Sequence, residues 1–451
     1  MASRPFVAVI LAAGQGARMK SALPKVLHAV AHRPMIAHVL EAVAPLKPAR
    51  TIVVIAPGME RAMPNAPGIE FAVQKEPLGT GHAVMAAAPM VHGFAGDILV
   101  LYGDTPLITP DSIAALRAAR TETTAPAIVV AGMRPDAPGG YARLVTGVGG
   151  SLDAIVEARD CGDSERGIGF VNAGPMAADA ETLLSLLDMI GRDNAQREYY
   201  LTSVVAAARA RGLACRAIEV PADDMAGAND RIELAAVEAL MQRRLRNRLM
   251  LAGVGMTAPD TVFLAADTEI GRDSMVGPYV VFGPGVRIGR NVDIVGFCHI
   301  VGTVAGDGAR IGPFARLRPG ADLAENVHVG NFVEVKNSRL EDGVKANHLA
   351  YLGDAAIGTR TNIGAGTITC NYDGIAKHHT DIGADVFIGT KSSLVAPVTI
   401  ADGAIVAAGS VITEDIPAEA LALGRARQTT KPGRAAAWRR KHTPRKKAPP
   451  G

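Results

Sequence analysis

A glycine-rich stretch near the N-terminus, LAAGQGARMKSALPK (residues 11–25), has residue types that suit phosphate binding. It follows the apolar run FVAVI, and Gly14 and Gly16 would let the backbone approach a phosphate closely. Arg18 and Lys25 add two positive charges, which suit a triphosphate better than a redox cofactor. The third glycine of a dinucleotide fingerprint is replaced by Met19, and the Gly-Lys-Ser/Thr of a Walker loop is absent. The stretch therefore predicts a nucleoside triphosphate that is consumed as a substrate.

A carboxylate in LYGDTPL (residues 101–107) provides a candidate metal ligand. Asp104 follows an apolar run and is therefore expected at the carboxyl edge of a sheet, where open α/β folds bind ligands. A single aspartate at the end of a strand is often only a turn or cap residue. Beside a glycine-rich phosphate loop, its oxygens favour a Mg²⁺ ion that also touches the triphosphate.

The elements that must position these residues alternate along the first half of the chain. Strand-like runs FVAVILA, RTIVVIA, GDILVLYGD and APAIVVAG alternate with the helical segments PMIAHVLEAV and PDSIAALRAAR. This alternation predicts a mostly parallel sheet covered on both faces. NDRIELAAVEALMQRRLRNRLM (229–250) predicts a long helix that connects two domains and has a solvated arginine-rich side.

Beyond residue 260 the sequence has a period of six, which neither an α-helix nor an alternating strand produces. It predicts a hexapeptide parallel β-helix whose narrow interior holds the repeated apolar residue. The residues of the three runs are Leu264, Ile270, Val276, Phe282, Ile288, Ile294 and Ile300, then Ile311, Leu317, Leu323, Val329 and Val335, then Ile382, Ile388, Leu394, Ile400, Val406 and Ile412. TCNYDGIAKHHT (369–380) interrupts the rhythm and is expected to leave the coil as a loop.

The glycine-rich stretch resembles the signature of the sugar-1-phosphate nucleotidyltransferases, L-x-x-G-x-G-[ST]-x-[ML] followed by P-K, with Ala17 in place of the small hydroxyl residue. With the hexapeptide repeats included, nearly the whole chain resembles the bifunctional uridylyltransferase and acetyltransferase family that makes UDP-N-acetylglucosamine, a precursor of peptidoglycan and lipopolysaccharide. The resemblance implies a Rossmann-like nucleotidyltransferase domain (1–228), a helical linker (229–252), a left-handed parallel β-helix (253–430) and a basic, mobile tail (431–451).

The family's chemistry implies two consecutive reactions. Acetyl-CoA acetylates glucosamine-1-phosphate in the C-terminal domain, and the N-terminal domain then transfers UMP from UTP to the product and releases pyrophosphate. Lys25 and Arg18 are the implied catalytic charges, and Asp104 and Asn229 the implied Mg²⁺ ligands. The implied UTP and sugar contacts are Leu11, Ala12, Ala13, Gly14, Lys25, Gln74, Gly79, Thr80, Tyr102, Gly103, Asp104, Gly140, Glu157, Asn172 and Asn229.

The same resemblance implies an acyl-transfer site in the repeats. His348 is the expected general base, because the amine must lose a proton before it attacks a thioester. Glucosamine-1-phosphate is expected at Arg318, Lys336, Tyr351 and Asn362, and acetyl-CoA at Ala365, Asn371, Tyr372, Lys377, Thr390, Ala408 and Arg425. Thr390 replaces the serine of the family motif, and His378 and His379 are interpreted as surface or structural histidines.

Composition limits the remaining possibilities. A chain of 451 residues predicts at least two domains, and a net charge of +3 is too small to indicate nucleic-acid binding. No apolar run has membrane-spanning length and no signal peptide is recognisable, so we expect a cytoplasmic protein without membrane insertion. The four cysteines are scattered and are interpreted as reduced structural thiols. The resemblance implies a homotrimer, and the basic tail could attract CoA phosphates.

Three other functions stay open at the level of sequence. The enzyme could transfer only nucleotides, with the repeats serving oligomerisation or regulation. The chain could be a non-catalytic subunit of an assembly, as in nucleotide-exchange complexes that share both domain types. The repeats could also be purely structural. The intact motifs around Lys25, Asp104, Lys336, His348 and Asn371 favour the enzyme with two sites.

Overall fold

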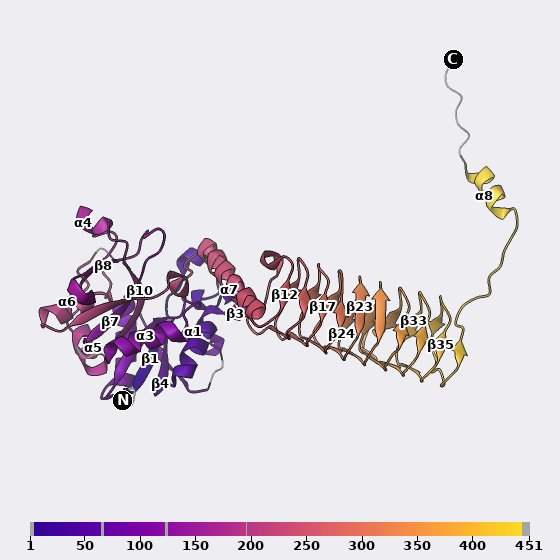
Figure 1. The fold of residues 1–451 in the computed structure, drawn as a ribbon, viewed down its shortest axis with the longest axis horizontal. Helices are drawn as coiled ribbons and strands as arrows, with labels where there is room; N and C mark the ends of the chain where they lie inside the picture. The colour runs from indigo at the N-terminus through magenta and orange to yellow at the C-terminus, as the bar shows by residue number, and fades with distance from the viewer. Residues whose placement is uncertain (1–3, 65–66, 122–124, 195, 444–451) are drawn as a thin grey trace, which may run out of the picture. The chain divides into compact units, whose positions relative to one another are not determined.

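The computed structural model describes residues 4–64, 67–121, 125–194 and 196–443. It divides into two compact units, one formed by residues 1–249 with 263–266 and the other by 250–262 with 267–451. Figure 1 shows a sheet with covering helices in the first unit and a regular stack of coils in the second. The two predicted fold types are confirmed.

The first unit is built on one sheet with the strand order β11-β7-β10-β6-β1-β4-β5, to which β8 and β9 attach through β10. β1 runs parallel to both β4 and β6, whereas β10 runs antiparallel to β6 and β7. The strands are β1 (Phe6–Leu11), β4 (Arg50–Ile55), β5 (Ile69–Val73), β6 (Asp97–Tyr102), β7 (Ile128–Met133), β8 (Arg143–Thr146), β9 (Leu152–Val156), β10 (Val171–Asp179) and β11 (Cys215–Glu219). The predicted strands are thus confirmed as β1, β4, β6 and β7.

Helices cover both faces of this sheet, because its strands are apolar on both sides. Along β1, Val7 and Val9 face one buried cluster while Ala8 and Ile10 face the other. The first cluster includes side chains of α2 and α5, and the second includes side chains of α1 and α3. The helices of this unit are α1 (Met35–Val43), α2 (Thr80–Val91), α3 (Pro110–Arg120), α4 (Asp163–Arg166), α5 (Ala180–Leu187), α6 (Ser203–Ala210) and α7 (Arg231–Leu251). A small hairpin pairs β2 (Ala29–Val30) with β3 (Arg33–Pro34).

The long helix predicted after residue 229 is α7, and it also binds a short segment of the chain that follows it. The side chain of Gln242 donates to the Leu264 carbonyl at 2.7 Å and accepts from the Leu264 amide at 2.8 Å. Leu264, predicted as the first residue of the six-residue run, therefore belongs with residues 263–266 to the first unit. Polar pairing of one buried glutamine with a backbone segment gives no periodic signal, so the sequence could not reveal that residues 263–266 belong to the first unit.

The second unit is a parallel β-helix made of three sheets, named here after the strands of one coil, β26, β27 and β28. The β26 sheet contains β12 (Gly255–Met256), β14 (Met275–Val276), β17 (Asp293–Ile294), β20 (Arg310–Ile311), β23 (His328–Asn331), β26 (Lys345–His348), β29 (Asn362–Ile363), β32 (Phe387–Ile388), β35 (Ile405–Val406) and β37 (Leu421–Ala422). The β27 sheet contains β15 (Val281–Phe282), β18 (His299–Ile300), β21 (Arg316–Leu317), β24 (Glu334–Lys336), β27 (Tyr351–Gly353), β30 (Ile368–Cys370), β33 (Ser393–Val395) and β36 (Val411–Ile412). The β28 sheet contains β13 (Glu269–Ile270), β16 (Arg287–Ile288), β19 (Thr303–Ala305), β22 (Ala321–Leu323), β25 (Ser338–Leu340), β28 (Ala355–Ile357), β31 (Thr380–Ile382) and β34 (Val398–Ile400).

The interior of the coils is filled as the period of six predicts, since every residue of the three apolar runs is buried. Phe282 is the one aromatic residue of these runs, and four other aromatic residues lie outside, at the corner between the β26 and β27 sheets. Tyr279, Phe297, Phe314 and Phe332 stack there with ring centroids 4.9, 5.0 and 5.1 Å apart. Each ring is about half exposed, and each residue has a positive φ, which bulky residues rarely adopt. We call these four residues the aromatic column.

The predicted loop leaves the coil between β30 and β31 and spans residues 371–379, where Tyr372 and Lys377 form an isolated antiparallel bridge. Within the basic tail, Arg434–His442 forms the exposed helix α8. Its alanines favour a helix, and four of its basic residues lie in the last turn, where they complement the helix dipole. Residues 444–451 of that tail lie outside the described residues.

The cysteines are free thiols, and Cys161, Cys215 and Cys298 are buried. Burial raises the pKa of both Cys215 and Cys298 to about 11, so these two thiols stay protonated at neutral pH. Among the described residues, no helix has the length and apolar character needed to cross a membrane.

Candidate functional sites

The glycine-rich stretch, β6 and the start of α2 surround a cleft of about 440 Å³ in the first unit. It lies where β1 and β6 end, because parallel neighbours bring their carboxyl ends to the same edge of a sheet. Eleven of its lining residues are among those predicted: Leu11, Ala12, Ala13, Gly14, Lys25, Gln74, Gly79, Thr80, Tyr102, Asp104 and Asn229. Val26, Pro77, Ala83 and Glu198 complete the wall.

Oxygen atoms from two distant segments converge on the ammonium of Lys25 inside this cleft. Lys25 Nζ forms an ion pair with Asp104 and donates to Asn229 Oδ1 at 3.1 Å. Glu233, one turn into α7, accepts from the Asn229 side-chain amide at 2.9 Å and so turns the Asn229 oxygen toward the lysine. These two hard oxygen donors already converge on a cation, the lysine ammonium, and therefore fit Mg²⁺ as well. Among the described residues, no group of three or more histidine, cysteine, aspartate or glutamate side chains is arranged to hold a metal ion.

Gln74 is 7% exposed, and its amide group is oriented by two acceptors. Gln74 Nε2 donates to the Gly79 carbonyl at 3.1 Å and lies 3.1 Å from His82 Nδ1. Both N–H groups are thus used within the protein, which leaves Oε1 to accept from a ligand. At Gly79, a φ of 104° and a Tyr199 carbonyl 2.6 Å from any added Cβ require glycine.

The other predicted residues of the first unit are outside the lining of this cleft. Arg18 is exposed, and Gly103 is packed against Leu11 and Ile36. Gly140 has no heavy atom within 4 Å of an added Cβ, Glu157 accepts from the Thr202 hydroxyl at 3.0 Å, and Asn172 accepts from the Gly174 amide at 3.1 Å. Burial and the charges of Asp104 and Glu157 raise the pKa of Tyr102. Glu157 therefore lies near enough to Tyr102, which lines the cleft, for its charge to act on that residue.

In the second unit, four predicted residues occupy the same corner in successive coils, between the β26 and β27 sheets. The Gly366 amide donates to the His348 carbonyl. In the next two coils, the Lys391 amide donates to the Ala365 carbonyl and the Gly409 amide donates to the Thr390 carbonyl. His348, Ala365, Thr390 and Ala408 therefore form a line along the coil axis with a spacing of about 4.8 Å. The corner position that the aromatic column occupies in earlier coils is taken here by Leu349, Gly366, Lys391 and Gly409, each with a positive φ.

His348 at the end of β26 is exposed and has one specific partner in the preceding coil. Its Nδ1 lies 2.5 Å from Asn331 Oδ1, an atom that can only accept. Nδ1 therefore carries the hydrogen, and Nε2 is left as the acceptor nitrogen. A hollow of about 430 Å³ beside this pair is lined by Phe314, Phe332 and His328, among others. Burial and the nearby cations lower the pKa of His328, so His328 is neutral at pH 7.

Positive side chains gather at the next corner, where the β27 sheet turns into the β28 sheet. Arg318 pairs with Glu334 at 2.8 Å, and Lys336 ends β24 two residues further on. The ammonium of Lys377, from the loop, lies beside Lys336 and lowers the Lys336 pKa. Two adjacent ammonium groups that repel one another form a suitable place for an anion.

The remaining predicted residues surround these two corners. Tyr351 starts β27, and its hydroxyl lies 3.5 Å from Asn371 Nδ2 at the base of the loop. Tyr372 is exposed within the loop, Asn362 starts β29 in the β26 sheet, and Arg425 lies close to Gly409. The structure thus places the predicted acetyl-CoA residue Lys377 beside Lys336, which was predicted to bind the sugar phosphate.

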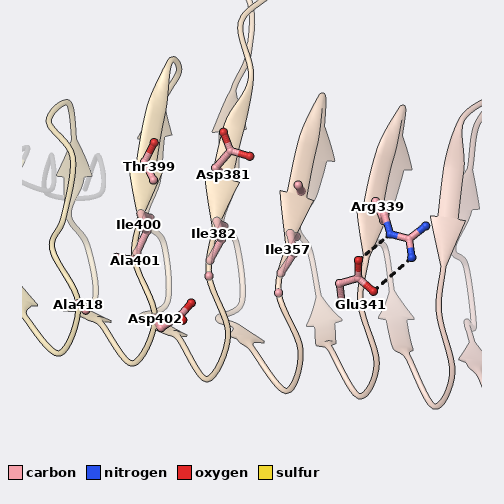
Figure 2. A pocket seen from close by; sticks show the side chains of 13 residues that line it. Arg339, Glu341, Ile357, Asp381, Ile382, Thr399, Ile400, Ala401, Asp402 and Ala418 are labelled. Carbon is pink, nitrogen blue, oxygen red and sulfur yellow. Dashed lines mark hydrogen bonds and ion pairs between the residues drawn. The ribbon is translucent and has the colours of Figure 1, made fainter.

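A further hollow of about 470 Å³ lies on the β28 sheet, away from these two corners (Figure 2). Arg339 crosses one end and pairs with Glu341 at 2.6 Å and with Asp322 at 2.7 Å. Asp381 and Asp402 lie on its other side. None of the predicted site residues lines this hollow.

Sequence reasoning missed four residues that form hydrogen bonds to predicted ones: His82, Glu233, Asn331 and Asp354, the last of which accepts from Asn371 Nδ2. Glu233 could have been found, because it follows Asn229 by four residues at the start of a predicted helix. The others act on residues that only the coiled or folded backbone brings near, so the sequence carries no spacing signal for them.

Comparisons with known proteins find a different domain type in each of the two units. Residues 8–166 match the MobA-like NTP transferase domain, and residues 267–302 and 379–414 match the bacterial transferase hexapeptide (six repeats). The chain is 55% identical over 432 residues to the bifunctional protein GlmU of Rhodospirillum rubrum, covering 96% of this chain and 97% of that protein. It is 49% identical to the protein of the same name from Paramagnetospirillum magneticum, covering 99% of each, and 53% identical to that from Cereibacter sphaeroides, covering 96% and 95%. This chain therefore belongs to the GlmU family of bifunctional proteins.

Proposed function

We propose that this chain makes UDP-N-acetylglucosamine in two steps, acetyl transfer in the second unit followed by uridylyl transfer in the first. The observation that carries the proposal is the presence of two separate sites, each with the groups that one reaction requires. Family membership and the two transferase domain matches support both activities.

For acetyl transfer, His348 is the proposed general base. Nε2 takes a proton from the amine of glucosamine-1-phosphate, the amine nitrogen bonds to the thioester carbon of acetyl-CoA, and the CoA thiolate leaves. Arg318 and Lys336 hold the sugar phosphate, and the position of Lys377 beside Lys336 supports a third contact of the same kind. The line formed by Ala365, Thr390 and Ala408 would carry the extended CoA arm, with Asn371, Tyr372 and Arg425 around it.

For uridylyl transfer, a phosphate oxygen of N-acetylglucosamine-1-phosphate attacks the α-phosphorus of UTP, and pyrophosphate leaves. Lys25 and the loop amides neutralise and position the phosphates, so no side-chain nucleophile is needed. Mg²⁺, which we propose is held by Asp104 and Asn229, supplies positive charge to the triphosphate when bound. Gln74 presents an acceptor, which matches the N3–H of uracil and not the N3 acceptor of cytosine.

We also propose that the protein works as a homotrimer in the cytoplasm. The exposed aromatic column supports self-association, because a continuous apolar strip on a surface is commonly an interface. Residues such as His348 and Asn362, which lie on or beside the β26 sheet, would then be close to a neighbouring copy.

The test supplies the purified full chain with glucosamine-1-phosphate, acetyl-CoA, UTP and Mg²⁺, and follows free thiol and pyrophosphate together. We expect thiol release without UTP and no pyrophosphate release without acetyl-CoA. Supplying N-acetylglucosamine-1-phosphate should remove the need for acetyl-CoA. Pyrophosphate release from glucosamine-1-phosphate and UTP alone would contradict the proposed order.

A further inference from the structure

A buried carboxylate that no part of the proposed reactions uses lies at the corner after β27. Asp354 is 9% exposed and follows Gly353, which pairs with Lys336 of the preceding coil. Its Oδ1 accepts from Asn337 Nδ2 at 2.6 Å, and its Oδ2 accepts from Asn371 Nδ2. Asp354 thus joins the coil before it to the coil after it through two amide groups.

Asp354 also closes the base of the 371–379 loop. Its side chain holds Asn371, where the loop begins, and its backbone carbonyl accepts from the Thr380 amide at 3.1 Å, where the loop ends. A second backbone bond joins the His378 amide to the Asn371 carbonyl at 2.9 Å. Lys377 lies one residue before this bond, so the base of the loop decides where its ammonium is placed.

Among side chains of this size, only a carboxylate can accept hydrogen bonds from both Asn337 and Asn371. Each asparagine presents a donor, and the two oxygens of an ionised carboxylate accept from both at once. Burial alone would raise the pKa of Asp354, but the hydrogen bonds from Asn337 and Asn371, together with the charges of Lys336 and Lys377, hold it below its ordinary value. The group therefore stays negative at neutral pH and balances the two nearby lysines.

We propose that Asp354 is a positioning residue for the acetyl-transfer site, which orients Asn371 and places Lys377 beside Lys336. The inference rests on the proposed function of this site. Asp354 does not touch the substrate. It keeps Lys336, Lys377 and the loop in a fixed arrangement before the substrate binds.

The test uses Asp354→Asn in the full chain. Asn337 and Asn371 both donate to the side chain at position 354. The amide of the variant offers only one acceptor oxygen, so one of these hydrogen bonds is lost together with the negative charge. We expect the KM for glucosamine-1-phosphate to rise and kcat/KM for thiol release to fall by about 10- to 100-fold, the usual loss when a charged hydrogen-bond partner is removed. Trypsin should also cleave faster after Lys377.

A double variant moves the negative charge from position 354 to position 337, and its activity is compared with that of Asp354→Asn. In Asn337→Asp/Asp354→Asn, the amide at 354 donates to the carboxylate at 337 and its oxygen still accepts from Asn371. We expect kcat/KM to return close to that of the unaltered protein, because both hydrogen bonds and the negative charge are restored. Asn337→Asp alone places two carboxylates together and should impair thiol release without such recovery.

The controls separate this inference from the proposed function. Pyrophosphate release from UTP and N-acetylglucosamine-1-phosphate should stay unchanged in every variant, and thermal unfolding reports on stability. If the unaltered protein releases no thiol from acetyl-CoA, the proposed function fails. If Asp354→Asn has unchanged KM and kcat, or if the double variant is as impaired as the single one, the positioning role is wrong.

Discussion

Removing the imidazole of His348 should abolish acetyl transfer while leaving uridylyl transfer intact. A positioned general base typically contributes 10²- to 10⁴-fold, so His348→Ala should lower kcat for thiol release by about that factor. The substitution should fold normally, because His348 is exposed and its backbone bonds to the next coil do not depend on the side chain. His299→Ala is the matched control, since that histidine is also exposed, lies in β18 and is none of the proposed site residues, so it should have no effect on either reaction.

The contact between His348 and Asn331 allows a finer test of the same reasoning. Nδ1 and Oδ1 are 2.5 Å apart, and losing one such hydrogen bond costs about 0.5–1.5 kcal/mol. Because a factor of ten corresponds to about 1.4 kcal/mol, Asn331→Ala should lower kcat by about 2- to 13-fold. Asn331→Asp places a carboxylate beside the ring and favours the protonated imidazole, so the acid limb of the pH–rate profile should move to higher pH.

The assay measures free thiol continuously at several pH values with saturating acetyl-CoA. Pyrophosphate release from N-acetylglucosamine-1-phosphate is recorded on the same samples. A His348→Ala enzyme that keeps more than about a tenth of the thiol-release rate would refute the assignment of the base. An acid limb that stays in place in Asn331→Asp would refute the role of Asn331.

Three further outcomes are expected. Asp104→Ala should abolish pyrophosphate release and spare thiol release, measured in the same two assays; loss of both would contradict the separation of the sites. His82→Ala should free the amide of Gln74 and lower the preference for UTP over CTP by about 2- to 13-fold in kcat/KM; unchanged selectivity would argue against that orientation. Arg120→Met should lower the free energy of unfolding of the first unit by about 2 kcal/mol, because it removes the 2.9 Å partner of the buried Asp97 and leaves only Arg4 at 3.3 Å. Urea titration followed by uridylyl transfer measures this loss, and a change below about 1 kcal/mol would contradict it.

Much of the fold could be predicted because the residues that fill its core form recognisable apolar patterns in the sequence. The strands of the sheet follow from continuous apolar runs and the buried residue of each coil from a period of six, and both predictions are confirmed. The attachment of residues 263–266 to the first unit could not be predicted, since it depends on one buried pairing between Gln242 and Leu264. The aromatic column was equally hidden, because nothing in the sequence indicates that Phe297 or Phe314 adopts a positive φ.

Site residues that belong to a contiguous motif could be predicted. Residues that hydrogen-bond to them from a distant part of the sequence could not. Gly14, Lys25 and Asp104 are recognisable from their own neighbourhoods, and all three line the cleft. Asn331 and Asp354 are separated by one coil from the residues they orient. Their hydrogen bonds exist only once the strands are in register, which no single-sequence pattern reports.

The way the 371–379 loop leaves the coil has a consequence for how such an enzyme can change over evolution. β31 pairs with β28 and with β34 in the register of any other coil, as though the loop were absent. Residues can therefore be inserted, deleted or exchanged at this point while the hydrogen-bond ladder and the buried core keep their free energy. Selection on the acyl acceptor or donor can act on the loop alone, and the protein can acquire a new substrate without first having to survive a loss of stability.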